Sequence, residues 1–133
     1  MASNATYVDS SALVKLVFAE RESAALRAFL AGRRPLVTSQ LAVTEVGRAA
    51  RRVQPTAAAR RQVIEVLDRV AVLAVSRDLA EQAVSLDPPS LRTLDAIHLA
   101  TALSLGADLG VFVAYDRRLL AAARAAGIAV ASP

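Results

Sequence analysis

Four acidic residues occupy positions where a carboxylate needs an explanation. Asp9 ends the run "TYVD" and Asp116 ends the run "VFVAYD", each directly after a short apolar stretch. Glu45 borders an apolar helical stripe, and Asp95 lies in "RTLDAIHLA", at the opening of a segment that is otherwise apolar. Because acidic side chains are almost never fully buried unless something pairs with them, each of the four is expected to have a partner.

A cation is one such partner, and the residue types limit which cation it is. The chain has no cysteine and a single histidine, His98, so a site built from these acids presents mainly oxygen ligands. Such a set is typical of Mg²⁺ or Mn²⁺ rather than zinc. One or two such ions can activate a water and stabilise the leaving oxygen in phosphodiester hydrolysis.

The two acids at the ends of apolar runs also have a purely structural explanation. Asp9 and Asp116 each precede a predicted helix, and aspartate is a preferred N-cap residue. Ser10 or Ser11 could cap the first of these helices as well. Capping and a site role therefore both stay open for Asp9 and Asp116.

The two acids inside predicted helices have alternatives of their own. Glu45 could form an i,i+3 ion pair with Arg48. Asp95 could be a first-turn acid favoured by the helix dipole, with Thr93 as the cap. His98 lies three residues after Asp95 on the same helix face, and we interpret it as a structural or supporting residue of the site.

Hydrophobic periodicity and turn residues predict an alternation of short apolar strands and helices. Strands are predicted over 5–9, 34–39, 70–76, 109–116 and 128–130, and helices over 10–20, 22–32, 40–53, 56–69, 77–86, 92–105 and 117–127. This alternation is typical of an α/β fold in which helices cover both faces of a central parallel sheet. If the first and fourth strands are both central, Asp9 and Asp116 lie at the same edge, where ligands bind in open parallel sheets.

Composition limits the class of protein. A length of 133 residues predicts one domain, 1–133, and 55% hydrophobic residues argue against disorder. The net charge of +4 favours a polyanionic partner such as nucleic acid, although Lys15 is the only lysine among the 16 basic residues. No apolar run approaches the length of a membrane span and no signal peptide is recognised, so a cytoplasmic protein without a membrane partner is expected.

Four segments together resemble a known family. "YVDSSALVKL", Glu45 in "TEV", "LDAIHLATAL" and "YDRRLLAAA" occur in the order and spacing of PIN-domain proteins, in particular VapC-type toxins of bacterial toxin–antitoxin pairs. The resemblance covers essentially the whole chain. One departure is Ala114, because many members carry Thr or Ser two residues before the fourth acid.

The resemblance implies a metal-dependent endoribonuclease with a central parallel sheet. Its catalytic and metal-binding acids fall on Asp9, Glu45, Asp95 and Asp116, with Mg²⁺ or Mn²⁺ as cofactor and RNA as substrate. It also implies a homodimer and a cognate VapB-like antitoxin whose C-terminal segment reaches into the acidic cleft. The alternative is a catalytically inactive PIN-fold module that binds RNA or a protein. Retention of all four acids favours the enzyme, since clustered carboxylates without metal repel phosphate.

Overall fold

Five parallel strands form the central sheet in the computed structural model, which describes residues 4–133. The strands are β1 (Ala5–Val8), β2 (Leu36–Ser39), β3 (Ala71–Leu73), β4 (Leu109–Val113) and β5 (Val130–Ala131). Their order across the sheet is β3-β2-β1-β4-β5, so β1 is the central strand and β4 lies beside it.

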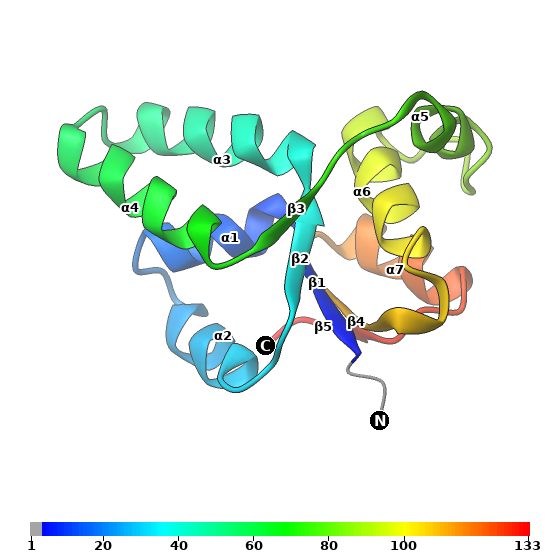
Figure 1. Ribbon diagram of the computed structural model, residues 1–133, viewed down its shortest axis with the longest axis horizontal. Helices are drawn as coiled ribbons and strands as arrows, with labels where there is room; N and C mark the ends of the chain where they lie inside the picture. The colour runs from blue at the N-terminus through cyan, green and yellow to red at the C-terminus, as the bar shows by residue number, and fades with distance from the viewer. Residues whose placement is uncertain (1–3) are drawn as a thin grey trace.

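Helices cover both faces of this sheet (Figure 1). The first face carries α1 (Ser10–Val17), α2 (Ser23–Leu30), α3 (Gln40–Val53) and α4 (Ala57–Asp68), and the second carries α5 (Arg77–Val84), α6 (Thr93–Leu103) and α7 (Arg117–Ala125). A short 3₁₀ turn, Gly106–Asp108, precedes β4. The predicted α/β fold with helices on both sides of a parallel sheet is confirmed. No helix within residues 4–133 is long and apolar enough to cross a membrane.

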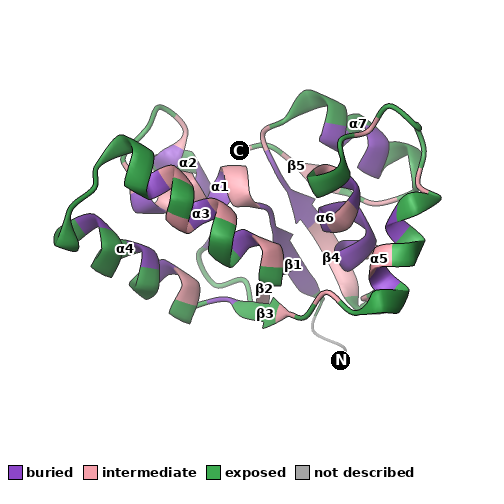
Figure 2. Ribbon diagram, turned by 90° about the horizontal axis from the view of Figure 1, so that it is seen from above, coloured by how far each residue is buried: buried purple, intermediate pink, exposed green. Residues whose placement is uncertain are grey.

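The two helical layers pack on opposite sides of the same strands. Successive strand residues point to opposite faces, so Val8 joins the core beneath α1 to α4 while Tyr7 joins the core beneath α6 and α7. Tyr7 stacks on Phe112 with ring centroids 5.1 Å apart, and Leu99 of α6 belongs to the same cluster. Figure 2 shows the buried residues concentrated along the strands and on the inner sides of the helices.

The chain order places a topological switch point between β1 and β4. From β1 the chain adds β2 and β3 on one side, and then crosses to add β4 and β5 on the other. Tyr7 pairs with Phe112 and Val8 with Val113, so the carboxyl ends of the two strands are level. The backbone N–H of Asp9 donates to the Val113 carbonyl at 3.1 Å, which extends this pairing by one step. Ligands of open parallel sheets bind at such a point.

Several predicted elements differ in length from the structure: α2 covers 23–30 rather than 22–32, β4 covers 109–113 rather than 109–116, and β5 covers 130–131 rather than 128–130. The clearest cases are α1 and β3. Helix α1 ends at Val17 rather than at residue 20, because Phe18 has an extended backbone and the Ser23 hydroxyl donates to the Lys15 carbonyl at 2.7 Å in place of a helical N–H. Strand β3 covers 71–73 rather than 70–76 and is largely exposed. It is an edge strand that pairs only with β2, so its apolar residues are not covered on both faces.

Candidate active site

Asp9 lies directly after β1 and is the N-cap of α1. Its Oδ1 accepts hydrogen bonds from the Ser11 hydroxyl at 2.7 Å and from the Ala12 N–H at 3.0 Å. Ser11 in turn accepts a hydrogen bond from the backbone N–H of Tyr115, in the loop after β4. Only 4% of Asp9 is exposed. The capping interpretation is therefore correct for Asp9, yet it uses only one carboxylate oxygen.

Asp116 has the same arrangement at the end of β4. It is the N-cap of α7, and its Oδ1 accepts hydrogen bonds from the backbone N–H groups of Arg118 and Leu119 at 2.9 and 3.0 Å. Ala114, two residues earlier, is fully buried in the core between the sheet and α7. Asp116 is thus positioned by the start of its own helix, and again one oxygen, Oδ2, accepts no hydrogen bond from residues 4–133.

Glu45 projects from α3 toward α1 and α6. Its Oε1 accepts hydrogen bonds from the Ser10 hydroxyl and from His98 Nε2, each at 2.6 Å. Its side chain is 26% exposed. Within residues 4–133 no ion pair joins Glu45 to Arg48, so these non-local contacts replace the local i,i+3 pair that the sequence allowed.

His98 is a buried link between the core and Glu45. It is 2% exposed, and its Nδ1 lies 2.7 Å from the Tyr7 hydroxyl. Burial is the main cause that raises the pKa of Tyr7, so this hydroxyl keeps its proton and donates it to Nδ1. With Nδ1 accepting from Tyr7, Nε2 is the ring nitrogen that carries a proton and donates it to Glu45. His98 therefore positions Glu45, and both of its ring nitrogens are engaged.

Asp95 is the third residue of α6 and does not cap it. The N-cap is Arg92, which makes no side-chain capping bond, and Thr93 is already inside the helix. Within residues 4–133 no hydrogen bond to the Asp95 carboxylate is found. Burial, followed by the charge of Asp116, raises the pKa of Asp95. Asp95 is thus a half-buried carboxylate in the first turn of α6, as the sequence allowed, but Thr93 is not the cap.

The acids influence one another electrostatically. Burial is the largest cause that raises the pKa of Asp9 to about 6, and the charge of Asp95 adds to it. Glu45 also raises the pKa of Asp95. Burial pushes the pKa of Glu45 up as well, but the hydrogen bonds from His98 and Ser10 outweigh it, so the net shift is downward. Asp95 is the member of the group that interacts with all three others.

The carboxyl edge of the sheet thus gathers acids from both helical layers. Asp9 and Asp116 come from strand ends, Glu45 from the first layer and Asp95 from the second. Asp95 and Asp116 also line a cavity of about 750 Å³, whereas Asp9 and Glu45 do not. Asp108, another acid close to Asp116 in the sequence, precedes β4 and so lies at the opposite edge of the sheet. The assignment of the four acids as one catalytic and metal-binding group remains a prediction.

The donor chemistry suits a hard cation such as Mg²⁺ or Mn²⁺. Carboxylate and hydroxyl oxygens are the available donors, and His98 has no free ring nitrogen. Among residues 4–133, no three acidic or histidine side chains are arranged closely enough to hold a metal by themselves. Magnesium usually retains several waters and takes only one or two protein carboxylates together with substrate phosphates, so an open site of this kind is compatible with it.

Two positioning residues were not assigned a site role from the sequence. The sequence suggests Ser10 and Ser11 only as helix caps, which is wrong: Asp9 is the N-cap of α1, Ser10 fixes Glu45 and Ser11 fixes Asp9. Their only sequence signal is that two hydroxyl residues directly follow a strand-end acid. Tyr7 was assigned only to the strand, and its partner His98 is 91 residues away.

We expect the raised pKa of Asp9 to destabilise the metal-free protein as the pH rises from about 4 to about 6. In this window the native state binds the Asp9 proton more tightly than the unfolded state does, so stability falls with increasing pH. Asp9→Asn keeps a capping side chain and removes the titration. In urea denaturation in EDTA at several pH values, the slope of stability against pH should be more positive for the variant than for the wild type, by up to about 1.4 kcal/mol per pH unit. Identical slopes for both proteins would contradict this account of Asp9.

Comparison with known proteins places the whole chain within one group of relatives. A family model described as PIN domain matches residues 6–126. Ribonuclease VapC46 of Mycobacterium tuberculosis is 46% identical over 129 residues, covering 97% of this chain and 98% of that protein. Ribonuclease VapC35 of the same species is 45% identical over 132 residues, covering 96% of both.

Solved structures share the fold. Mycobacterium tuberculosis VapC20, described as a sarcin-ricin loop cleaving toxin, superposes with a TM-score of 0.76 at 24% identity, covering 96% of this chain and 99% of that one. A toxin–antitoxin complex from Klebsiella pneumoniae contains a chain that superposes with a TM-score of 0.72 at 23% identity, covering 96% of this chain and 97% of that one.

Proposed function

Because this chain belongs to the PIN-domain family, we propose that it is a VapC-type toxin of a toxin–antitoxin pair. Its activity is endoribonucleolytic hydrolysis of RNA phosphodiester bonds, with Mg²⁺ or Mn²⁺ bound by Asp9, Glu45, Asp95 and Asp116. Identity of 45–46% to two ribonucleases over nearly the full length supports the activity. The main support for the site assignment is the hydrogen bonding of three of the four acids, Asp9, Glu45 and Asp116.

In each of these three acids, one oxygen takes the hydrogen bonds and the other is left for a ligand. Asp9 and Asp116 use Oδ1 and Glu45 uses Oε1. Hydrogen bonds to one oxygen fix the orientation of the second, which is how supporting residues orient metal-binding carboxylates in general. An acid that served only the local stability of its helix would not need partners from other helices, yet Glu45 has Ser10 of α1 and, from the other layer, His98 of α6.

The side chains around the proposed metal site have different roles. His98 and Ser10 keep Glu45 ionised and fixed, since their hydrogen bonds lower its pKa. Asp95, whose two oxygens accept no hydrogen bond from residues 4–133, is the most adaptable of the four. A bound Mg²⁺ or Mn²⁺ would supply charge neutralisation at the phosphodiester and a more acidic water. Without it, the carboxylates would repel the RNA backbone.

The proposal extends to partners and location. We propose that a VapB-like antitoxin binds the chain and that the chain forms a homodimer in the cytoplasm. Exposed apolar side chains are consistent with protein contacts; they are Val43, Val53, Ile64, Val72, Val84 and Leu94. Light scattering on the purified protein, alone and with the product of the neighbouring upstream gene, measures both associations.

The experiment that tests the function is cleavage of total RNA by the purified chain. We expect fragments with Mg²⁺ or Mn²⁺, none in EDTA, and none with the Asp9→Asn protein under either condition. The asparagine side chain can still accept the capping hydrogen bonds, so thermal melting should show that the variant is folded. An intact RNA pool with a folded, metal-loaded wild-type protein would favour the non-enzymatic binding module instead. Cleavage that persists in EDTA would exclude the metal-dependent mechanism.

A further inference from the structure

One end of the α3–α4 hairpin carries an unusual concentration of positive charge. The segment 46–64 contains five arginines and no acidic residue. All five are exposed, and no ion pair within residues 4–133 involves them. We call this set the α3–α4 arginine strip; its members are Arg48, Arg51, Arg52, Arg60 and Arg61.

The strip begins beside the candidate active site. With 100° per residue in an α-helix, Arg52 lies about 20° and Arg48 about 60° around α3 from Glu45. These three residues therefore share one side of the helix. Arg48 is about 5 Å and Arg52 about 10 Å farther along the helix axis than Glu45. Since Glu45 reaches Ser10 and His98 at the sheet edge, the two arginines form a line of positive charge leading away from the site.

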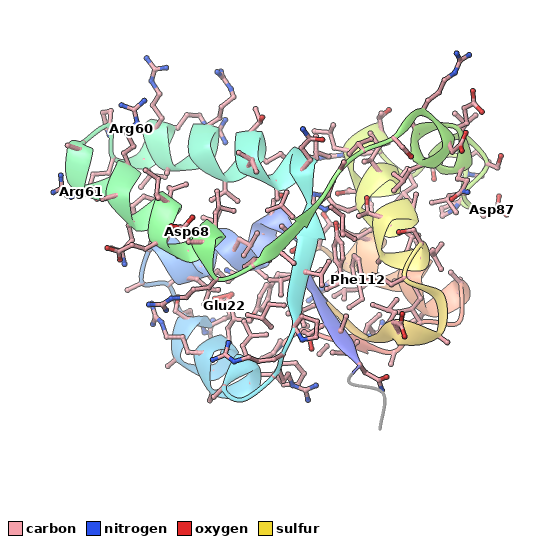
Figure 3. All side chains as sticks on the ribbon, viewed as in Figure 1. Glu22, Arg60, Arg61, Asp68, Asp87 and Phe112 are labelled. Carbon is pink, nitrogen blue, oxygen red and sulfur yellow. The ribbon has the colours of Figure 1, made fainter. Side chains whose placement is uncertain are left out.

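The start of α4 continues the line. Helix α3 runs outward from the sheet and α4 returns, so the end of α3 and the start of α4 lie together at the tip of the hairpin (Figure 1). Figure 3 shows Arg60 and Arg61 extending into solvent at this tip. Glu65 lies one turn beyond Arg61, but no ion pair joins the two within the described residues. The arginines are thus available to an external anion.

We propose that the α3–α4 arginine strip binds the sugar–phosphate backbone of RNA outside the catalytic cleft. This inference rests on the proposed function, because a polymer cut at Glu45 must continue across the neighbouring surface. Guanidinium groups bind phosphate through paired hydrogen bonds and remain charged at all relevant pH values. Contacts to phosphate position a nucleic acid without reading its sequence. The strip therefore contributes affinity and register, and it leaves the choice of cleavage site to other residues.

The test is a comparison of charge-matched variants of the full chain. The strip variant carries Arg48→Gln and Arg52→Gln, and the control carries Arg21→Gln and Arg77→Gln. Both control arginines are exposed and lie outside the strip, and both proteins lose the same net charge. Fluorescence anisotropy in EDTA measures binding of a fluorescein-labelled single-stranded RNA at several salt concentrations, so cleavage does not interfere. Thermal melting confirms that both variants are folded.

We expect the strip variant to bind RNA at least tenfold more weakly than the control and with a weaker salt dependence. Loss of two phosphate contacts on a single strand should reduce the slope of log K against log salt by about 1.4. Arg48→Lys with Arg52→Lys should restore most of the slope, because the charge returns. Equal affinity and slope for the strip variant and the control would overturn the inference. Unchanged RNA binding with weakened binding of a poly-glutamate peptide would overturn it in favour of an acidic protein partner.

The same proteins separate this inference from the proposed function. If wild-type protein fails to cut RNA with Mg²⁺ or Mn²⁺, the enzymatic proposal fails. The anisotropy data then still decide whether the strip holds RNA. If wild-type protein cuts RNA and the strip variant cuts and binds as well as the control does, only the inference about the strip fails.

Discussion

The Asp95→Asn protein is expected to lose metal-dependent RNA cleavage by roughly 100-fold or more while its metal-free fold stays as stable as the original. Mutation of residues that merely orient metal ligands costs about 10–100-fold, so loss of a direct ligand should cost at least as much. The substitution removes one negative charge and keeps the shape of the side chain. Initial cleavage rates on one labelled RNA at saturating Mg²⁺ measure the loss.

The stability half of this prediction follows from the charges around Asp95. Its favourable interaction with the start of α6 contributes about 0.3–1 kcal/mol in such positions. Repulsion from Asp116 and Glu45 acts against it, so neutralisation should be close to neutral or slightly stabilising in EDTA. Metal should raise the melting temperature of the wild type more than that of the variant, because a ligand stabilises the state that binds it.

Asp78 provides the matched control. It is an acidic residue in the first turn of α5, on an exposed surface. We expect Asp78→Asn to lose a few tenths of a kcal/mol and no activity. Three results together would assign Asp95 to helix formation alone. The Asp95→Asn protein would be destabilised like the control, would respond to metal as the wild type does, and would still cut RNA at the original rate.

Replacement of His98 with Ala is expected to damage both stability and activity. The buried ring leaves a cavity, and the Tyr7 hydroxyl loses a partner at 2.7 Å. Together these effects should destabilise the protein by about 3 kcal/mol. Glu45 also loses its hydrogen bond from Nε2, so its orientation and ionisation are no longer fixed. We expect a further loss of about 10–100-fold in cleavage per folded molecule.

A substitution at the neighbouring residue Leu99 distinguishes the loss of stability from the loss of activity. Leu99 is equally buried in α6, but it belongs to the apolar core with Tyr7 and Phe112 and has no polar group to bind Glu45. Leu99→Ala should destabilise the protein by about 2–5 kcal/mol and leave the rate per folded molecule close to wild type. Denaturant titration gives the stabilities, and cleavage rates are corrected for the folded fraction. If His98→Ala loses no more activity than Leu99→Ala does, the role assigned to His98 in positioning Glu45 is wrong.

Local sequence signals were sufficient for the order and type of the elements. Thr56 and Ser39 cap α4 and α3 as their residue types suggest, and alternation of apolar strands with helices correctly indicated the layered fold. The predicted bounds are wrong where contacts between segments distant in the sequence determine the length of an element. The apolar run 70–76 is typical of a buried strand, yet only 71–73 pair, because this strand forms the edge of the sheet. Periodicity does not specify which strand is at an edge.

The site was predictable in its residue types but not in its contacts. A carboxylate after an apolar strand and another opening an apolar helix could be identified from local pattern alone. The partners of Glu45 are 35 and 53 residues away, at Ser10 and His98. Arg48 lies three residues after Glu45 on the same side of α3, so helical periodicity favoured a Glu45–Arg48 ion pair. No such pair is found within the described residues. Only the folded chain shows that Glu45 turns inward and leaves Arg48 exposed.

The distribution of the acids along the chain has a consequence for folding. Asp9 and Asp116 are far apart in the sequence and become neighbours only when β4 pairs with the central strand β1. A polypeptide truncated before β4 keeps β1 and the first helical layer but lacks Asp116. Because pairing between segments so distant in the sequence is slow to form, the four acids come together only at a late stage of folding.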